Sequence, residues 1–137
     1  MNSATETTEQ ENIAVVTRGF EAYARGDYAT VEAVFADNAS WSVIPAGVLP
    51  GPHHKTRGEV LAYLALIHQE TQGTIVATPV AIAASGHKVF VEMTLRAQRK
   101  GQLMESDQVA IFTVEAGKIK KVQQHFADFP TYARFYK

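Results

Sequence analysis

A helix, a Gly-Asp break, a second helix and a strand follow one another near the N-terminus, and this order constrains the fold more than any other feature. The first helix is predicted by apolar residues at the spacing of one helical face: Ile13, Val16, Phe20 and Tyr23. Gly26 can adopt the left-handed conformation that ends a helix, and Asp27 can cap the next one. Asp37-Asn38 is typical of a turn, after which residues 39–44 alternate with the period of a strand.

One long helix and four strands are predicted in the rest of the chain. Residues 56–71 carry a helical apolar face, and Gly73 ends that helix. The four strands, separated by short turns, are predicted at residues 74–84, 89–99, 102–114 and 118–126. Residues 45–55 are rich in Pro and Gly and are predicted to form a loop. Helices followed by a run of strands indicate an α+β fold.

Length and composition narrow the class of protein. The 137 residues predict one domain spanning residues 1–137, with a polar segment at residues 1–8 that we expect to be disordered. The 13 basic and 14 acidic residues form no basic stripe for nucleic acid, and the absence of cysteine excludes thiolate chemistry. No apolar run approaches the ~20 residues of a membrane helix, and the N-terminus differs from a secretory signal. We therefore expect a cytoplasmic protein that binds neither nucleic acid nor membranes.

Several short motifs resemble those of one superfamily. They are the opening that runs from Gly26-Asp27 to Phe35-Ala36-Asp37, Gly51 in a Pro-rich loop, the helix start at residues 56–60, and the late strands at residues 109–114 and 117–119. Together they resemble the nuclear-transport-factor-2-like superfamily, and within it the SnoaL-like and ketosteroid-isomerase-like proteins. This resemblance implies a cystatin-like α+β barrel with three helices. Its cone-shaped curved antiparallel sheet would wrap around the N-terminal helix and leave an apolar pocket at the open end.

The catalytic groups of those relatives are replaced in this sequence. By resemblance, a ketosteroid isomerase would have a Tyr at Gly19, a carboxylate base at Val43 and a second acid at Gln108 or Val109. A SnoaL-like cyclase would have its Asp at Gln124, and an amide cannot act as a general base at neutral pH. The resemblance therefore implies the pocket but transfers neither activity.

Periodicity predicts which side chains line the pocket, because residues two apart on a strand share a face, as do residues three or four apart on a helix. The predicted ligand-binding residues are Tyr23, Trp41, Val109, Gln124, Phe126 and, from the loop, His53. Asp107 shares the strand face of Val109 and is the candidate catalytic acid or base, since carboxylates beside apolar cavities are suited to proton transfer. The alternative is that Asp107 is a solvated residue at a strand end.

Several other polar residues leave alternatives open. His53-His54 could bind a metal, contact the pocket mouth or belong to a plain loop. Because no Asp, Glu or Cys lies nearby at ligand spacing, we predict no metal site. His125 is expected on the outer side of the sheet, and Asp128 could close the pocket or cap a C-terminal turn. The sequence has neither a Gly-rich phosphate loop nor a nucleophile elbow, and we predict no cofactor.

Three classes of function remain. The protein could be a cofactor-free isomerase, cyclase or hydrolase that moves a proton on a small hydrophobic molecule. It could instead be a non-catalytic binder of a small apolar ligand, or a partner-binding module whose cavity is vestigial. Asp107 or His125 facing the cavity favours the enzyme, whereas an apolar cavity with only Gln124, Tyr23 and Trp41 favours the binder. A cavity filled by side chains favours the third class, and the resemblance by itself favours the enzyme.

The outer face of the sheet predicts a homodimer. Its predicted residues include Phe90, Thr94, Phe112 and Val114. Such an apolar face is unfavourable in water and pairs with a second copy in many symmetric oligomers.

Overall fold

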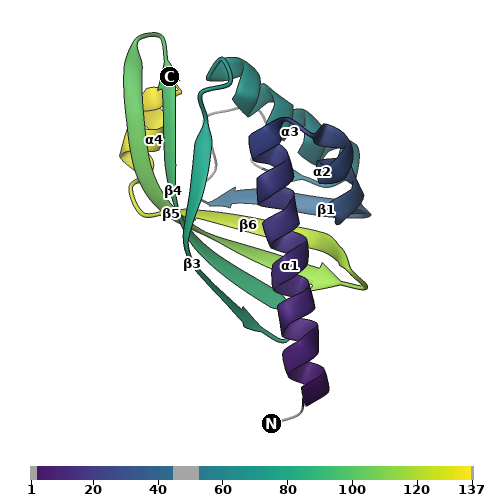
Figure 1. Cartoon of the computed structure of the whole chain (residues 1–137). Coiled ribbons are helices and arrows are strands. Elements are labelled where there is room, and N and C mark those ends of the chain that lie inside the picture. The colour runs from purple at the N-terminus through teal and green to yellow at the C-terminus, as the bar shows by residue number, and fades with distance from the viewer. Residues whose placement is uncertain (1–2, 45–52, 137) are drawn as a thin grey trace.

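The computed structural model describes the backbone of residues 3–44 and 53–136, and the side chains of residues 8–43 and 55–136. Four helices and six strands follow one another in the described chain (Figure 1). The helices are α1 (Ser3–Arg25), α2 (Tyr28–Val34), α3 (Arg57–Glu70) and α4 (Phe129–Phe135). The strands are β1 (Phe35–Ile44), β2 (His53–His54), β3 (Val76–Ser85), β4 (Lys88–Arg99), β5 (Gln102–Glu115) and β6 (Lys118–Phe126).

The strands form one curved sheet in the order β2-β1-β6-β5-β4-β3. Helix α1 lies across the concave face of this sheet, while α2 and α3 gather beside the C-terminal end of α1 (Figure 1). The predicted α+β fold is therefore confirmed. The sheet is mixed, however, because β1 pairs with β6 in parallel, and all other neighbours are antiparallel.

Local turn chemistry explains this mixture. The turns Lys100-Gly101 and Ala116-Gly117 have positive φ at both residues, which is the geometry of the two-residue turn that joins antiparallel strands. Strands β4, β5 and β6 are therefore forced to run up and down. Strand β1 reaches β6 from the other end of the chain, and no tight turn dictates its direction. A sequence prediction based on turns alone misses such a pairing.

The helix ends are set by the residues that the sequence indicated. Gly26 has φ +72° after α1, and the Asp27 carboxylate accepts a 3.1 Å hydrogen bond from the backbone N–H of Thr30. Thr56 caps α3 in the same way, because its hydroxyl oxygen accepts a 3.1 Å hydrogen bond from the backbone N–H of Glu59. Both contacts satisfy backbone donors that a helix N-terminus leaves free.

The structure corrects three expectations about the elements. Helix α1 begins at Ser3, so residues 3–8 are helical where we expected disorder. His53-His54 forms the short strand β2 against Trp41 and Ser42, where we expected only loop. A fourth helix, α4, follows β6, and Asp128 caps it by accepting a 3.2 Å hydrogen bond from the backbone N–H of Thr131. Of the two roles open to Asp128, the cap is therefore the one observed.

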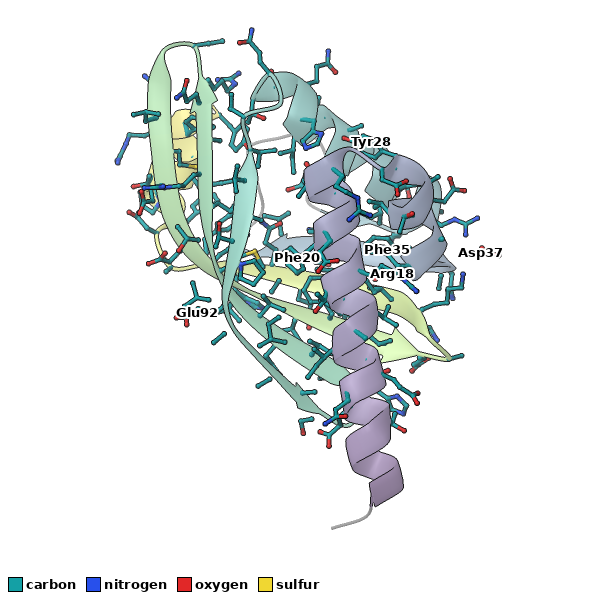
Figure 2. The ribbon with its side chains drawn as sticks, viewed as in Figure 1. Arg18, Phe20, Tyr28, Phe35, Asp37 and Glu92 are labelled. Atoms are coloured by element: carbon teal, nitrogen blue, oxygen red, sulfur yellow. The ribbon has the colours of Figure 1, made fainter. Side chains whose placement is uncertain are left out.

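The core lies between α1 and the concave face of the sheet. Phe20 of α1 packs edge-on against Phe112 of β5, with ring centroids 5.8 Å apart. Figure 2 shows Phe20 and Phe35 between the helix and the sheet, whereas Glu92 points away from them. Phe112 and Val114 are buried in this core, so their predicted place on the outer face is wrong.

No helix in the described part of the chain is long and apolar enough to cross a membrane.

Candidate functional site

A cavity of about 100 Å³ lies between α1, α3, α4 and the concave face of the sheet. Aliphatic and aromatic side chains dominate its wall, and none of the described side chains that line it carries a charge. The polar groups on the wall come from six residues: Tyr23, Trp41, Gln108, Gln124, Tyr132 and Tyr136. Such an apolar hollow with a few fixed polar groups is typical of a small-molecule site.

Two buried glutamines and the only tryptophan form a connected row on one wall. The indole N–H of Trp41 donates to Oε1 of Gln124 at 3.0 Å, and Nε2 of Gln124 donates to Oε1 of Gln108 at 2.8 Å. Nε2 of Gln108 lies 3.3 Å from Sδ of Met93 and donates to it. Strand register creates the row, because β1, β6, β5 and β4 are consecutive neighbours in the sheet. The hydrogen bonds fix the orientation of both amides in an otherwise apolar wall.

Tyr23 of α1 forms the opposite side of the cavity. Its hydroxyl donates a 3.0 Å hydrogen bond to the backbone oxygen of Leu64, and its ring stacks on His68 with centroids 4.3 Å apart. The hydroxyl of Tyr28 lies 2.6 Å from Nδ1 of His68. Burial raises the pKa of Tyr23 far above its ordinary value and lowers the pKa of His68. Both side chains are therefore neutral at pH 7.

Helix α4 covers a further part of the cavity with Tyr132 and Tyr136. Their rings lie 4.9 Å apart, and burial raises the pKa of both hydroxyls. Arg99 of β4 ties this helix to the sheet. Its Nη1 donates a 3.1 Å hydrogen bond to the backbone oxygen of Phe135, and its guanidinium lies 5.9 Å from the centre of the Tyr136 ring. Arg99 therefore stabilises α4 without lining the cavity itself.

Comparison with known proteins agrees with this architecture. A family model of the SnoaL-like domain matches residues 16–122. The chain belongs to the SnoaL-like family. It is also similar to an uncharacterized protein of Mycobacterium tuberculosis, with 28% identity over 127 residues that cover 88% of this chain and 92% of that protein.

Solved structures resemble this SnoaL-like chain along almost its whole length. Bal32a, from a soil-derived mobile gene cassette, superposes with a TM-score of 0.89 at 26% identity, covering 94% of this chain and 98% of that one. An LEH-like epoxide hydrolase of M. tuberculosis superposes with a TM-score of 0.75 at 18% identity, covering 94% of this chain and 91% of that one. The second likeness shows the fold alone.

Three of the predicted ligand-binding residues of this SnoaL-like chain lie on the cavity wall: Tyr23, Trp41 and Gln124. Phe126 does not line the cavity, and its ring packs 4.1 Å from that of Tyr132 behind the wall. The side chain of His53 lies outside the described residues. That these three wall residues bind a ligand stays a prediction.

The prediction of which side chains of β5 face the cavity is wrong by one residue. Asp107 and Val109 are exposed on the outer face of the sheet, and Val109 is 39% exposed. The Asp107 carboxylate accepts a 2.9 Å hydrogen bond from the Thr94 hydroxyl on β4. The side chains that face the cavity are instead Gln108, Ala110 and Phe112. Asp107 is therefore not a catalytic acid or base of this cavity.

The sequence contained a signal for the correct parity. Residues 109–114 are apolar on both faces of β5, so alternation in that half of the strand is ambiguous. Glu105 and Asp107 occupy one parity in the other half, and charged side chains favour the solvent face. That signal would have placed Gln108 inward.

Within the described chain, no group of His, Asp or Glu side chains could hold a metal ion.

Proposed function

We propose that the protein binds a small, largely apolar molecule in this cavity without changing it chemically. The observation that carries the proposal is the composition of the wall. Its described side chains offer large apolar area and oriented amide and indole groups, but no carboxylate and no imidazole. Proton-transfer catalysis needs a group whose pKa lies near the working pH, and the buried tyrosines have pKa values displaced upward.

Trp41 is the residue that we expect to contact the ligand most. It lies on the cavity wall, its N–H is held by Gln124, and its ring packs 5.9 Å from that of Tyr63. A fixed indole offers a large contact area at little cost in side-chain entropy. Because Trp41 is the only tryptophan, its indole N–H gives one NMR signal that reports on the cavity directly.

The experiment is a ligand screen followed by NMR titration of this indole signal. Small cyclic molecules of one or two rings, including fragments of the polyketide and terpenoid classes, are first tested for a rise in Tm, because the cavity measures about 100 Å³. A ligand of the cavity should shift the Trp41 N–H signal. It should bind the Trp41→Ala variant more weakly, with a loss of about 1–3 kcal/mol in binding free energy. Leu103→Ala is the control, because Leu103 is 79% exposed and does not line the cavity, and it should leave the affinity unchanged. A ligand that binds Trp41→Ala as tightly as the wild type would contradict this site.

An enzyme remains the second candidate function. The likeness to an epoxide hydrolase favours it only through the shared fold. By resemblance, SnoaL-like cyclases have an Asp at the position of Gln124. The Gln124 amide accepts a hydrogen bond from Trp41 and donates one to Gln108. Product formation from any ligand found in the screen, measured by mass spectrometry, would favour this candidate over the binder.

We also propose that the protein forms a homodimer through the outer face of the sheet. Phe90 and Val109 lie there on the adjacent strands β4 and β5 and are 36% and 39% exposed. Ile111 stands opposite Phe90 in the strand register and extends the apolar area. A second copy is the natural cover for such a patch.

A further inference from the structure

We infer that Gly19 determines how large a ligand the cavity accepts, because it leaves a notch in the face of α1 that the ligand enters. This inference rests on the proposed binding function and names the class of ligand, a one-ring molecule with a short alkyl substituent. It follows from a glycine in a helix that does not need one.

The notch lies in the part of α1 that faces the cavity. Val16 lies three residues before Gly19 and Tyr23 lies four residues after it, so the three share one helical face, and all three line the cavity. The two neighbours carry large side chains, whereas Gly19 carries none. The helix therefore meets the cavity with a gap one side chain wide.

The backbone at Gly19 does not require a glycine. Gly19 lies in the interior of α1, and it lacks the positive φ that Gly26 and Gly117 have. Among the described residues, a methyl group there would have two neighbours within 4 Å beyond its own helix. They are Cγ2 of Val34 at 3.4 Å and Cδ1 of Ile119 at 4.0 Å. Both are ordinary van der Waals distances, so an alanine would fit without moving α2 or β6.

Glycine is an unfavourable residue at such a position. In the interior of a helix only proline is less favourable, because glycine loses the most backbone entropy on folding. An alanine would also gain contacts with Val34 and Ile119. The missing side chain therefore weakens the fold, and the part of the molecule that gains from it is the cavity. We assign Gly19 to the ligand for this reason.

The walls of the notch indicate which part of the ligand enters it. Val16 and Ile119 offer only hydrocarbon, and the Tyr23 hydroxyl is already bonded to the backbone oxygen of Leu64. A polar group there would lose its hydration without gaining a partner, so an alkyl group suits the notch. The cavity of about 100 Å³ is comparable with the ~150 Å³ that admits benzene, which leaves room for one ring.

A series of alkylbenzenes tests the inference. Benzene, toluene, ethylbenzene and n-propylbenzene differ only in the length of the alkyl group, and their binding to the protein is measured by isothermal titration calorimetry. In Gly19→Ala the added methyl group takes space that the longer probes use. We expect the affinity for benzene to change less than twofold. The longest probe that the wild type binds should lose about fourfold, the contribution of one buried CH₂ group.

Two further variants show whether the effect is steric and local. Ile119→Val removes Cδ1, the atom across the notch, so the double variant Gly19→Ala/Ile119→Val should regain the longest probe to within about twofold of the wild type. Gly58→Ala is the matched control, because Gly58 is also helical, is exposed and does not line the cavity. It should leave the affinities for the whole series unchanged.

The stability of the ligand-free protein gives a readout that does not depend on any probe. Gly19→Ala should raise the folding equilibrium constant about two- to fivefold, measured by urea unfolding, because alanine is favoured in a helix interior. A fall in this constant would show that α1 needs the glycine to pack against α2. The inference would then be overturned.

The binding outcomes separate this inference from the proposed function. If Gly19→Ala weakens all probes equally or none of them, or if the wild type binds only benzene, the cavity binds small molecules but Gly19 does not set their size. A double variant that stays as weak as Gly19→Ala would likewise overturn the inference alone, as would a screen that yields a ligand while no alkylbenzene binds. If no alkylbenzene binds and the screen also gives no ligand, the proposed function is overturned and the inference with it.

Discussion

Trp41 and Gln124 are joined by a 3.0 Å hydrogen bond between the indole Nε1 and the amide Oε1, although 83 residues separate them in sequence. The bond crosses the parallel pair β1 and β6, in which Trp41 stands opposite Val122 and Val43 opposite Gln124. It therefore joins the first strand of the chain, β1, to the last strand, β6, at the wall of the cavity.

The first prediction concerns this bond. Gln124→Leu should lower the free energy of unfolding by about 1–3 kcal/mol, because it leaves both the Trp41 N–H and Oε1 of Gln108 without their partner in a buried place. Urea unfolding with an unchanged m-value measures this loss. Gln123→Leu, the same change on the half-buried opposite side of β6, should cost clearly less. Equal losses would show that the buried row contributes no stability of its own.

The second prediction is that Asp107→Asn changes little. Asp107 is exposed on the outer face of the sheet, where its partner is the hydroxyl of Thr94. An asparagine can accept the same hydrogen bond, so the stability should stay within about 0.5 kcal/mol of the wild type. The affinity for any cavity ligand should not change either. A measurable loss of binding in Asp107→Asn would mean that the assigned strand parity of β5 is wrong.

How far the sequence predicts this molecule can be judged from β5 and β6. The bounds of β6, residues 118–126, agree with the prediction, because the turn at Gly117 defines where the strand begins. Trp41 and Gln124 were placed inward correctly, because each lies two residues along its strand from a buried valine, Val43 and Val122. Strand β5 is apolar on both faces near Val109, and there periodicity carries no information about which face is buried. Only the charged residues Glu105 and Asp107, earlier in the strand, indicate the parity, and the packing of Phe112 against α1 agrees with them.

Two other elements were missed for different physical reasons. Strand β2 has only two residues, His53-His54, and it exists because β1 offers an edge for pairing. Asp128 and Pro130 lie at the start of α4, and both residue types are suited to a helix start. Its seven residues, however, are too few to show a helical period, and its stability depends on contacts with the sheet.

The third prediction concerns pH. Burial lowers the pKa of His68, whose Nδ1 lies 2.6 Å from the Tyr28 hydroxyl, while its ring stacks on the neutral Tyr23. In the unfolded chain the same histidine has a pKa of about 6.5. Between the folded and the unfolded pKa the unfolded state binds more protons, so stability falls as the pH drops below about 6.5 and is unaffected by His68 above it.

Comparison with His68→Gln measures this effect. Glutamine can still form a hydrogen bond with the Tyr28 hydroxyl, because its amide both donates and accepts, but it cannot be protonated near neutral pH. Urea unfolding at a series of pH values from about 7.5 to 5 should show a smaller loss of stability on acidification in the variant than in the wild type. Parallel curves for the two proteins would mean that protonation of His68 is not linked to unfolding.

The fourth prediction concerns the helix that covers the cavity. Asp128→Ala removes the oxygen that accepts hydrogen bonds from the N–H and the hydroxyl of Thr131 at the start of α4. The loss of such a cap should cost about 1 kcal/mol. Without this cap, amide hydrogen exchange in α4 should be faster in the variant than in the wild type, whereas exchange in α1 should not change. The change matters for the site because Tyr132 of α4 and Tyr136 at its end line the cavity. Unchanged exchange in α4 would show that Arg99 and the aromatic contacts hold the helix without the cap.

The last prediction tests the homodimer. Phe90 is 36% exposed on the outer face of β4, on the same side of the strand as Glu92, which points away from α1 and the core in Figure 2. Phe90→Glu would place a charge in the centre of the proposed interface, and in a symmetric dimer each such charge approaches its copy. Sedimentation velocity at micromolar concentration should give a dimer for the wild type and a monomer for Phe90→Glu. Leu103→Glu is the control, since Leu103 is 79% exposed near the end of the β4–β5 hairpin, away from Phe90 along the strands. It should remain a dimer, whereas a wild-type monomer, or a Phe90→Glu dimer of undiminished affinity, would remove this face as the interface.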